Sequence, residues 1–279
     1  MPVKQSGAQR ASSKRSVRLT ALSLSFALLA LAGAINPGSA AAAGMKVVVI
    51  VGPTGSATAN YIYNAKKYAS QARSYGATVV ELYSPNATWA RVKAAAQGAK
   101  VLIYLGHGNG HPSPYGVFSK YTKDGFGLNA TAGNGNSNTK YYGEYLIDTQ
   151  IQLAPNAVVI LNRLCYASGN SEWGRANPTR SVAMQRVDNF AAGFLRAGAK
   201  AVFAEGITSA ATILYGLFRT TKTIGGVFQG SASWHGGYDF AFQSRRNPNY
   251  RVWMDPTSPG RYYRSVVGNL GMNVRTFRS

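Results

Sequence analysis

This chain of 279 residues has very little cysteine, histidine and acid, and each shortage excludes a class of protein. A single cysteine cannot form a disulfide within its own chain, so a disulfide-stabilised scaffold is excluded. Three histidines and nine acidic residues argue against a Cys/His zinc cluster or an EF-hand, and no metal is expected. Disorder throughout is also excluded, because 46% of the residues are hydrophobic and can form a core.

Basic residues are plentiful by contrast, with 30 lysines and arginines and a formal charge of +21. After residue 43 they are scattered, with no dense basic run and no nucleic-acid-binding motif. Such a charge attracts anionic surfaces over long range. We therefore expect solubility and weak retention on anionic cell-wall polymers, and no specific binding of nucleic acid.

The N-terminal 43 residues have the three parts of a secretory signal. Residues 1–18 contain five basic residues and no acid, residues 19–35 are uncharged and apolar, and small residues follow at 39–43. A membrane anchor is the alternative, but the apolar run is short for a span of about 20 residues. The pattern predicts a cleaved signal peptide over 1–43, a secreted protein with association to the cell wall, and a formal charge of +16 after cleavage. No membrane contact is expected after cleavage.

Apolar runs alternate with helical patterns along the rest of the chain. The runs at 46–52, 78–83, 100–105, 157–161 and 201–204 predict strands, and the continuous β-branched run at 46–52 suits a strand buried on both faces. Strands that alternate with amphipathic helices predict an α/β fold, a three-layer sandwich with a mostly parallel central sheet. We expect this domain to cover 44–225, with a long Gly/Asn-rich loop at 109–143 and a C-terminal extension, 226–279, packed on the same domain.

Two chemically capable residues follow predicted strands, where parallel sheets bind their ligands. Cys165, the only cysteine, is a candidate nucleophile, although a buried inert thiol and intermolecular pairing remain open. His107 lies between two glycines and could carry a proton to the leaving amine. The backbone N–H groups of Gly108 and Cys165 are candidates for binding the oxyanion.

The segments VLIYLGHGNG and AVVILNRLCYASG, together with DNFAAGFLRAGAKAVFAEG, resemble the clan CD cysteine peptidases, which include caspases, gingipains and CHAT domains. The resemblance covers roughly residues 45–220. It implies a caspase-like fold and a His107–Cys165 dyad, with Gly108 supplying an oxyanion N–H. It also implies a peptide or protein substrate cleaved through a thioester, without a cofactor. One departure is Leu164, where many members carry a small or acidic residue before the cysteine.

Members specific for arginine or lysine carry an acid in the substrate pocket, and Glu205 and Glu172 are the candidates here. The sequence thus favours a secreted cysteine endopeptidase. Two alternatives stay open. One is a catalytically silent, wall-associated binding protein of the same fold, and the other is a cell-wall amidase or transpeptidase that uses the same thiol. Because no G-x-S-x-G motif is present, a serine α/β-hydrolase is disfavoured.

Overall fold

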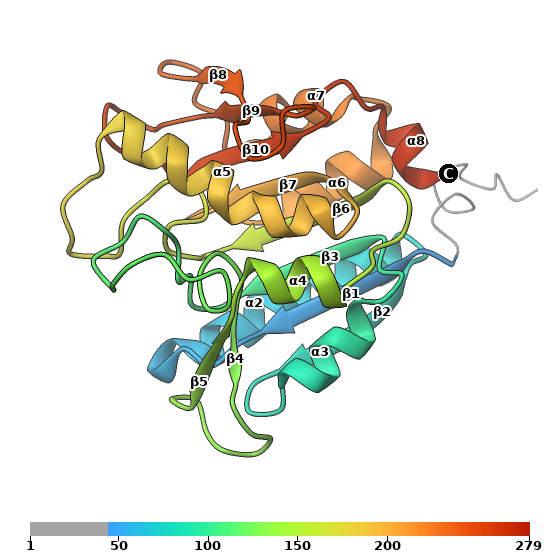
Figure 1. Cartoon of the computed structure of the whole chain (residues 1–279). Helices are drawn as coiled ribbons and strands as arrows, with labels where there is room; N and C mark the ends of the chain where they lie inside the picture. The colour runs from blue at the N-terminus through green and yellow to red at the C-terminus, as the bar shows by residue number, and fades with distance from the viewer. Residues whose placement is uncertain (1–43) are drawn as a thin grey trace, which may run out of the picture. The chain divides into compact units, whose positions relative to one another are not determined.

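An eight-stranded sheet forms the centre of residues 44–279, the part of the chain that the computed structural model describes (Figure 1). The predicted signal peptide, 1–43, lies outside these residues. The strand order is β2-β1-β3-β6-β7-β10-β9-β8. The first five strands are parallel to one another, and the last three pair antiparallel. The strands are β1 (Lys46–Val51), β2 (Thr78–Tyr83), β3 (Val101–Leu105), β6 (Ala157–Asn162), β7 (Ala199–Glu205), β8 (Phe240–Gln243), β9 (Arg251–Met254) and β10 (Arg264–Gly268).

Helices cover both faces of this sheet, and each face has its own core. Alternate residues of β1 point to opposite faces, so Val49 packs with Ala69 on one side while Ile50 packs with Val92 on the other. The first face is covered by α2 (Thr58–Ser74), α6 (Ala211–Arg219), α7 (Ile224–Gln229) and α8 (Val274–Arg278). The second is covered by α3 (Trp89–Ala96), α4 (Glu144–Gln150) and α5 (Arg180–Arg196). A short 3₁₀ turn, η1 (Gly55–Ala57), precedes α2. The predicted three-layer α/β sandwich with a mostly parallel sheet is confirmed.

The segment 109–143, expected as one long loop, contains a β-hairpin. Its strands are β4 (Phe126–Asn129) and β5 (Thr139–Tyr142), which pair antiparallel outside the main sheet. All four residues of β4 are buried, because the strand packs on the central layer through contacts such as Phe126 with Tyr104. The Gly- and Asn-rich sequence around β4 gives no sign of a strand, because β4 is stabilised by tertiary contacts.

The C-terminal residues 226–279 extend the central sheet itself. β10 lies antiparallel to β7, with Arg264 opposite Glu205, and β9 and β8 follow outward. Few aliphatic residues are needed because β10 joins a sheet whose core already exists, and Val266 and Val267 face its two sides. Within residues 44–279, no helix has both the length and the hydropathy needed to cross a membrane.

Candidate active site

The ends of β3 and β6 lie side by side and carry the two candidate catalytic residues. The strands are parallel, with Leu105 opposite Asn162, so the segments that follow leave the sheet at the same edge. Their backbones touch: a Cβ added to Gly108 would lie only 1.9 Å from the carbonyl oxygen of Cys165. Only glycine permits this approach. The structure therefore places His107, next to Gly108, beside the segment that bears the sulfur.

Tyr104, which the sequence analysis did not single out, fixes the backbone at His107. Its ring is fully buried, and its hydroxyl lies 3.0 Å from the His107 carbonyl oxygen and 2.9 Å from that of Gly127. The same hydroxyl accepts a hydrogen bond of 2.8 Å from the Gly127 N–H. Burial raises the pKa of Tyr104 far above its usual value, so the phenol keeps its proton. Tyr104 thus ties the histidine loop to β4.

The backbone around Cys165 adopts conformations that most residues avoid. Arg163 and Tyr166 have φ values of 62° and 69°, in the left-handed region. The conformation is held from outside the loop: the Arg163 N–H donates to the Glu205 carbonyl at 2.8 Å, and the Tyr61 hydroxyl donates to the Arg163 carbonyl at 3.1 Å. These contacts turn the chain sharply after β6 and leave Cys165 half-buried. Unusual backbone angles of this kind often occur at functional sites.

Two backbone N–H groups at the junction have no protein acceptor. Among the described residues, neither the N–H of Gly108 nor that of Cys165 donates to a carbonyl or a side chain. Buried N–H groups without a partner are uncommon in folded proteins. Gly108 is buried from bulk solvent but lines the larger cavity, so its free donor is available to a group that enters the site. These are the two donors that the sequence analysis proposed for an oxyanion.

Both candidate catalytic groups are neutral at rest near neutral pH. Burial, reinforced by the negative charge of Glu172, raises the pKa of the Cys165 thiol to about 11. Burial lowers the pKa of His107, and Glu172 only partly offsets this effect. Within residues 44–279, no hydrogen bond joins the thiol to the imidazole. The site therefore has no preformed thiolate–imidazolium pair, and the thiol must lose its proton as a substrate reacts.

Two cavities meet at Cys165. One, of about 660 Å³, is lined by His107, Gly108 and Tyr115. The other, of about 510 Å³, is lined by Arg163, Tyr262 and other residues of the loops after β6 and β9. Cys165, Glu172 and Trp173 border both, and Trp173 is almost fully exposed, at 97%. Cys165 thus lies where the two cavities adjoin.

The two acids proposed for a substrate pocket lie in different environments. Glu172 borders both cavities, and its carboxylate accepts a hydrogen bond of 2.6 Å from the hydroxyl of Tyr115. Glu205 is fully buried. Its carboxylate binds the Arg264 guanidinium through two hydrogen bonds, of 2.8 and 3.0 Å, and also accepts one from Thr208. The structure thus places Glu172 beside Cys165, while the side chain of Glu205 lines neither cavity.

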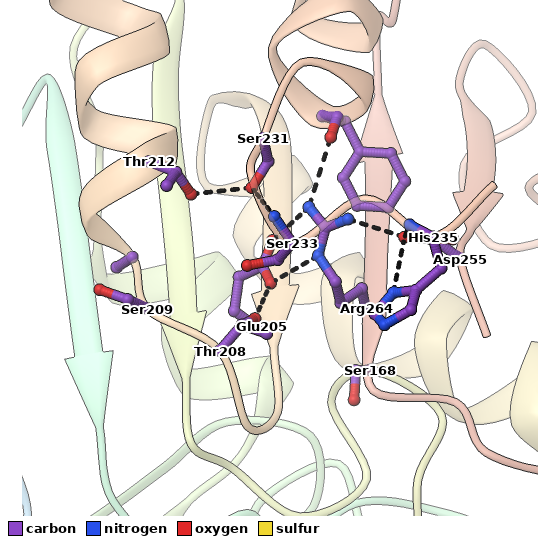
Figure 2. A network of polar contacts seen from close by, with 12 residues as sticks. Ser168, Glu205, Thr208, Ser209, Thr212, Ser231, Ser233, His235, Asp255 and Arg264 are labelled. Atoms are coloured by element: carbon purple, nitrogen blue, oxygen red, sulfur yellow. Dashed lines mark hydrogen bonds and ion pairs between the residues drawn. The ribbon is translucent and has the colours of Figure 1, made fainter. Parts of the chain in front are cut away.

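Arg264 links Glu205 to a second buried acid, as Figure 2 shows. Its guanidinium also donates to Asp255 at 2.7 Å and lies over the ring of Phe228. Asp255 accepts further hydrogen bonds from the backbone N–H groups of His235 and Gly236. No sequence pattern pointed to this network, because its members are far apart along the chain. Its ion pairs tie β7 to β10 at the edge where Gly206 lines the smaller cavity.

No protein-family model matches this chain, and no curated protein sequence matches it. Among solved structures, it is similar to the Arg-specific cysteine proteinase gingipain R, with 13% sequence identity and a TM-score of 0.38. The match covers 85% of this chain and 63% of that chain. Because this similarity is so low, function is inferred from the residues of the site and not from the structural similarity.

Proposed function

We propose that the chain is a cysteine endopeptidase of the clan CD type, in which Cys165 and His107 form the dyad. The observation that carries this proposal is the contact between Gly108 and the Cys165 backbone, which unites the only thiol with a histidine loop. The unpartnered N–H groups of Gly108 and Cys165 and the two adjoining cavities support it. A peptide or protein is the substrate that we propose for two cavities that adjoin at the sulfur.

The neutral dyad gives the order of events. As the sulfur of Cys165 bonds to the scissile carbonyl carbon, the thiol proton passes to His107. The carbonyl oxygen becomes an oxyanion, which the N–H groups of Gly108 and Cys165 stabilise. The C–N bond breaks as His107 gives its proton to the leaving amine, and a thioester remains. Water then attacks the thioester, His107 takes its proton, and the thiol and a carboxylic acid are released.

Glu172 is the acid that we propose for substrate selection in this reaction. Its carboxylate borders both cavities at the sulfur, where it can attract a basic side chain of the substrate. Glu205, the other candidate from the sequence, would act instead through Arg264 on the shape of the smaller cavity. Peptides with lysine or arginine beside the scissile bond are expected to be cleaved better than glutamate counterparts, as a peptide library would measure.

A labelling experiment tests the dyad. A peptidyl acyloxymethyl ketone should modify Cys165 in the native protein, and His107→Ala should slow this by about a hundredfold, since a positioned acid–base group contributes 10²–10⁴-fold. His235→Ala, which changes a histidine outside both cavities, is the matched control and should label normally. Equal labelling of all three proteins would show a merely exposed thiol and overturn the proposal.

The catalytically silent alternative is favoured by the raised pKa of the Cys165 thiol, about 11, which keeps the thiol protonated. Within residues 44–279, the thiol also has no hydrogen bond to His107. A protein of that kind would bind peptides without cleaving them. Mass spectrometry of a peptide library after incubation separates the two: new termini support a peptidase, and bound but intact peptides support the alternative. Transfer of a peptide to an added amine in place of water would instead indicate the transpeptidase.

We also propose that the protein is secreted and associates with the cell wall. The signal-like pattern of residues 1–43 and the high positive charge support this location. Fractionation of the producing cells should find the protein, shortened near residue 43, in the medium and in a wall fraction that high salt releases. A full-length protein inside the cells would contradict the proposal.

A further inference from the structure

A third cavity, of about 620 Å³, lies between α5 and the β8–β9 hairpin. It shares no lining residue with the two cavities at Cys165. One face of α5 forms a wall, because Arg180, Met184 and Asp188 recur at intervals of four residues. Arg245 and Arg246, from the loop after β8, face them. The reaction at Cys165 gives this cavity no role.

Two of its three arginines have guanidiniums that no acidic side chain of residues 44–279 pairs with. Arg246 is neutralised, since its guanidinium holds both oxygens of Glu144 at 2.8 Å. The guanidiniums of Arg180 and Arg245 donate to no acceptor among the described residues, and both side chains are exposed to the cavity and solvent. Arg180 also lies with its guanidinium 3.8 Å from the centre of the Phe240 ring. Stacking of this kind holds the group in place while its N–H edge stays free.

The acid in the cavity wall, Asp188, cancels only part of this positive charge. Asp188 is buried, and its carboxylate accepts hydrogen bonds of 2.5 Å from the Ser244 hydroxyl and 2.7 and 3.1 Å from the N–H groups of Arg245 and Arg246. These donors are neutral, so Asp188 keeps its negative charge and offsets one arginine, but its oxygens are bound to the loop that presents the arginines. With Arg246 paired to Glu144, the two remaining guanidiniums leave the cavity with a net positive charge. Helix α5 begins at Arg180, and the dipole at its N-terminus adds positive potential to this end of the cavity.

Two apolar side chains in the lining indicate the kind of molecule that would fit. The remaining lining residues are polar: His111, Ser181, Gln185 and Asn189. Met184 and Phe242 supply apolar surface beside the arginines. Guanidiniums that approach from a helix and from a facing loop suit an anion with several oxygens in a tetrahedral arrangement, whereas a planar carboxylate offers only two. An organic group bonded to that anion would lie on the apolar surface.

We propose that this cavity is a binding site for a phosphate ester, in which Arg180 and Arg245 hold the phosphate and Met184 and Phe242 contact its organic group. The site is independent of the cysteine chemistry. A small phosphomonoester and one unit of a phosphodiester polymer present the same chemistry, so both are candidates for the natural ligand.

Calorimetric titration of the purified protein with phenyl phosphate at fixed ionic strength tests the proposal. Phenyl phosphate is expected to bind saturably at one site. Inorganic phosphate, which lacks the ring, and benzoate, which lacks the tetrahedral anion, should both bind more weakly than phenyl phosphate. Replacing both arginines, in Arg180→Gln/Arg245→Gln, should lower the affinity by about tenfold or more, because the anion loses both of its charged hydrogen-bond donors.

Arg91→Gln/Arg251→Gln is the matched control, because it removes the same charge from two exposed arginines that do not line the cavity. Its affinity should stay within about twofold of the native value. Thermal melting of each variant should be unchanged. Equal loss in the control, tighter binding of benzoate, or no saturation up to about 10 mM would each overturn the proposal.

A second titration with poly(glycerol phosphate) distinguishes the two sources of ligand. Tighter binding of the polymer than of phenyl phosphate, with the same dependence on Arg180 and Arg245, would identify a phosphodiester polymer. Equal or weaker binding would identify a small phosphomonoester. A polymer affinity that falls equally in the matched control would show general attraction by charge and contradict a defined site.

Discussion

At the scale of single residues, the Tyr104 hydroxyl positions the candidate catalytic histidine without touching a substrate. It connects the His107 carbonyl, from the loop after β3, to both backbone groups of Gly127 on β4. A buried hydroxyl with three neighbours leaves polar groups unsatisfied when it is removed. The position of the imidazole therefore depends on a residue from the middle of an apolar run.

Tyr104→Phe should lower the free energy of unfolding by about 1–3 kcal/mol, because two carbonyls and one N–H lose a buried partner. It should also slow labelling of Cys165 by about tenfold or more, since small misplacements of a catalytic group are costly. Denaturant unfolding and probe kinetics measure the two effects. Tyr63→Phe, on an exposed tyrosine, is the control, and slow labelling there would remove the special role of Tyr104.

After burial, Glu172 is the second cause of the raised pKa of the candidate nucleophile. Its charge raises the pKa of Cys165, so Glu172→Gln should lower this pKa. More thiolate would then be present at any pH below the pKa, and a decrease of half a unit would raise the alkylation rate at pH 8 by about threefold. The pH dependence of alkylation by iodoacetamide measures it. An unchanged profile would mean that the carboxylate does not face the sulfur.

At the scale of elements, the site depends on how closely the loops after β3 and β6 approach. The parallel pairing of these strands sets where the loops begin, and a glycine lets their backbones touch. The left-handed residues Arg163 and Tyr166 then turn the second loop so that Cys165 is half-buried beside both cavities. Neither loop would form this junction without the other.

Gly108→Ala should separate the two loops. Its Cβ would meet the Cys165 carbonyl at 1.9 Å, and because that atom belongs to the backbone, the loops must shift. We expect a loss of about 1–3 kcal/mol in stability and slower labelling of Cys165 by about a hundredfold. Gly237→Ala, at a glycine with open space around it, should change neither quantity. Normal labelling of Gly108→Ala would show that the contact does not hold the site together.

At the scale of the whole molecule, a buried ion network joins the parallel and antiparallel parts of the sheet. Arg264 on β10 holds Glu205 at the end of β7 and Asp255 just after β9, and all three side chains are fully buried. Each acid depends on the arginine, because an uncompensated charge in the interior is very unfavourable. The network thus makes the C-terminal strands part of the wall behind the smaller cavity.

Arg264→Met should lower the free energy of unfolding by about 3–5 kcal/mol, the usual consequence of removing one partner from a buried pair. Adding Glu205→Gln should recover part of the loss, since one of the two stranded charges disappears. Urea unfolding curves measure both, with Arg251→Met, at an exposed arginine of β9, as the control. An equal loss in the single and double variants would show that Glu205 and Arg264 do not act as a pair.

Much of the fold follows from local pattern. The strand predicted at 78–83 coincides with β2, and the other four predicted strands overlap β1, β3, β6 and β7. Continuous apolar runs separated by amphipathic helices have few alternatives to a covered parallel sheet. The hairpin of β4 and β5 was missed, because Phe126–Asn129 is stabilised by packing on Tyr104 and not by its own propensity.

By itself, the sequence determined which residues follow buried strands, and so which ones reach the edge of the sheet where His107 and Cys165 lie. Only the tertiary structure decided what each side chain meets there. Glu172 and Glu205 were equal candidates for the substrate pocket, yet one borders the cavity at the thiol and the other is bound by Arg264. The physical reason is that the environment of a charge depends on groups from distant parts of the chain, which only folding brings into contact.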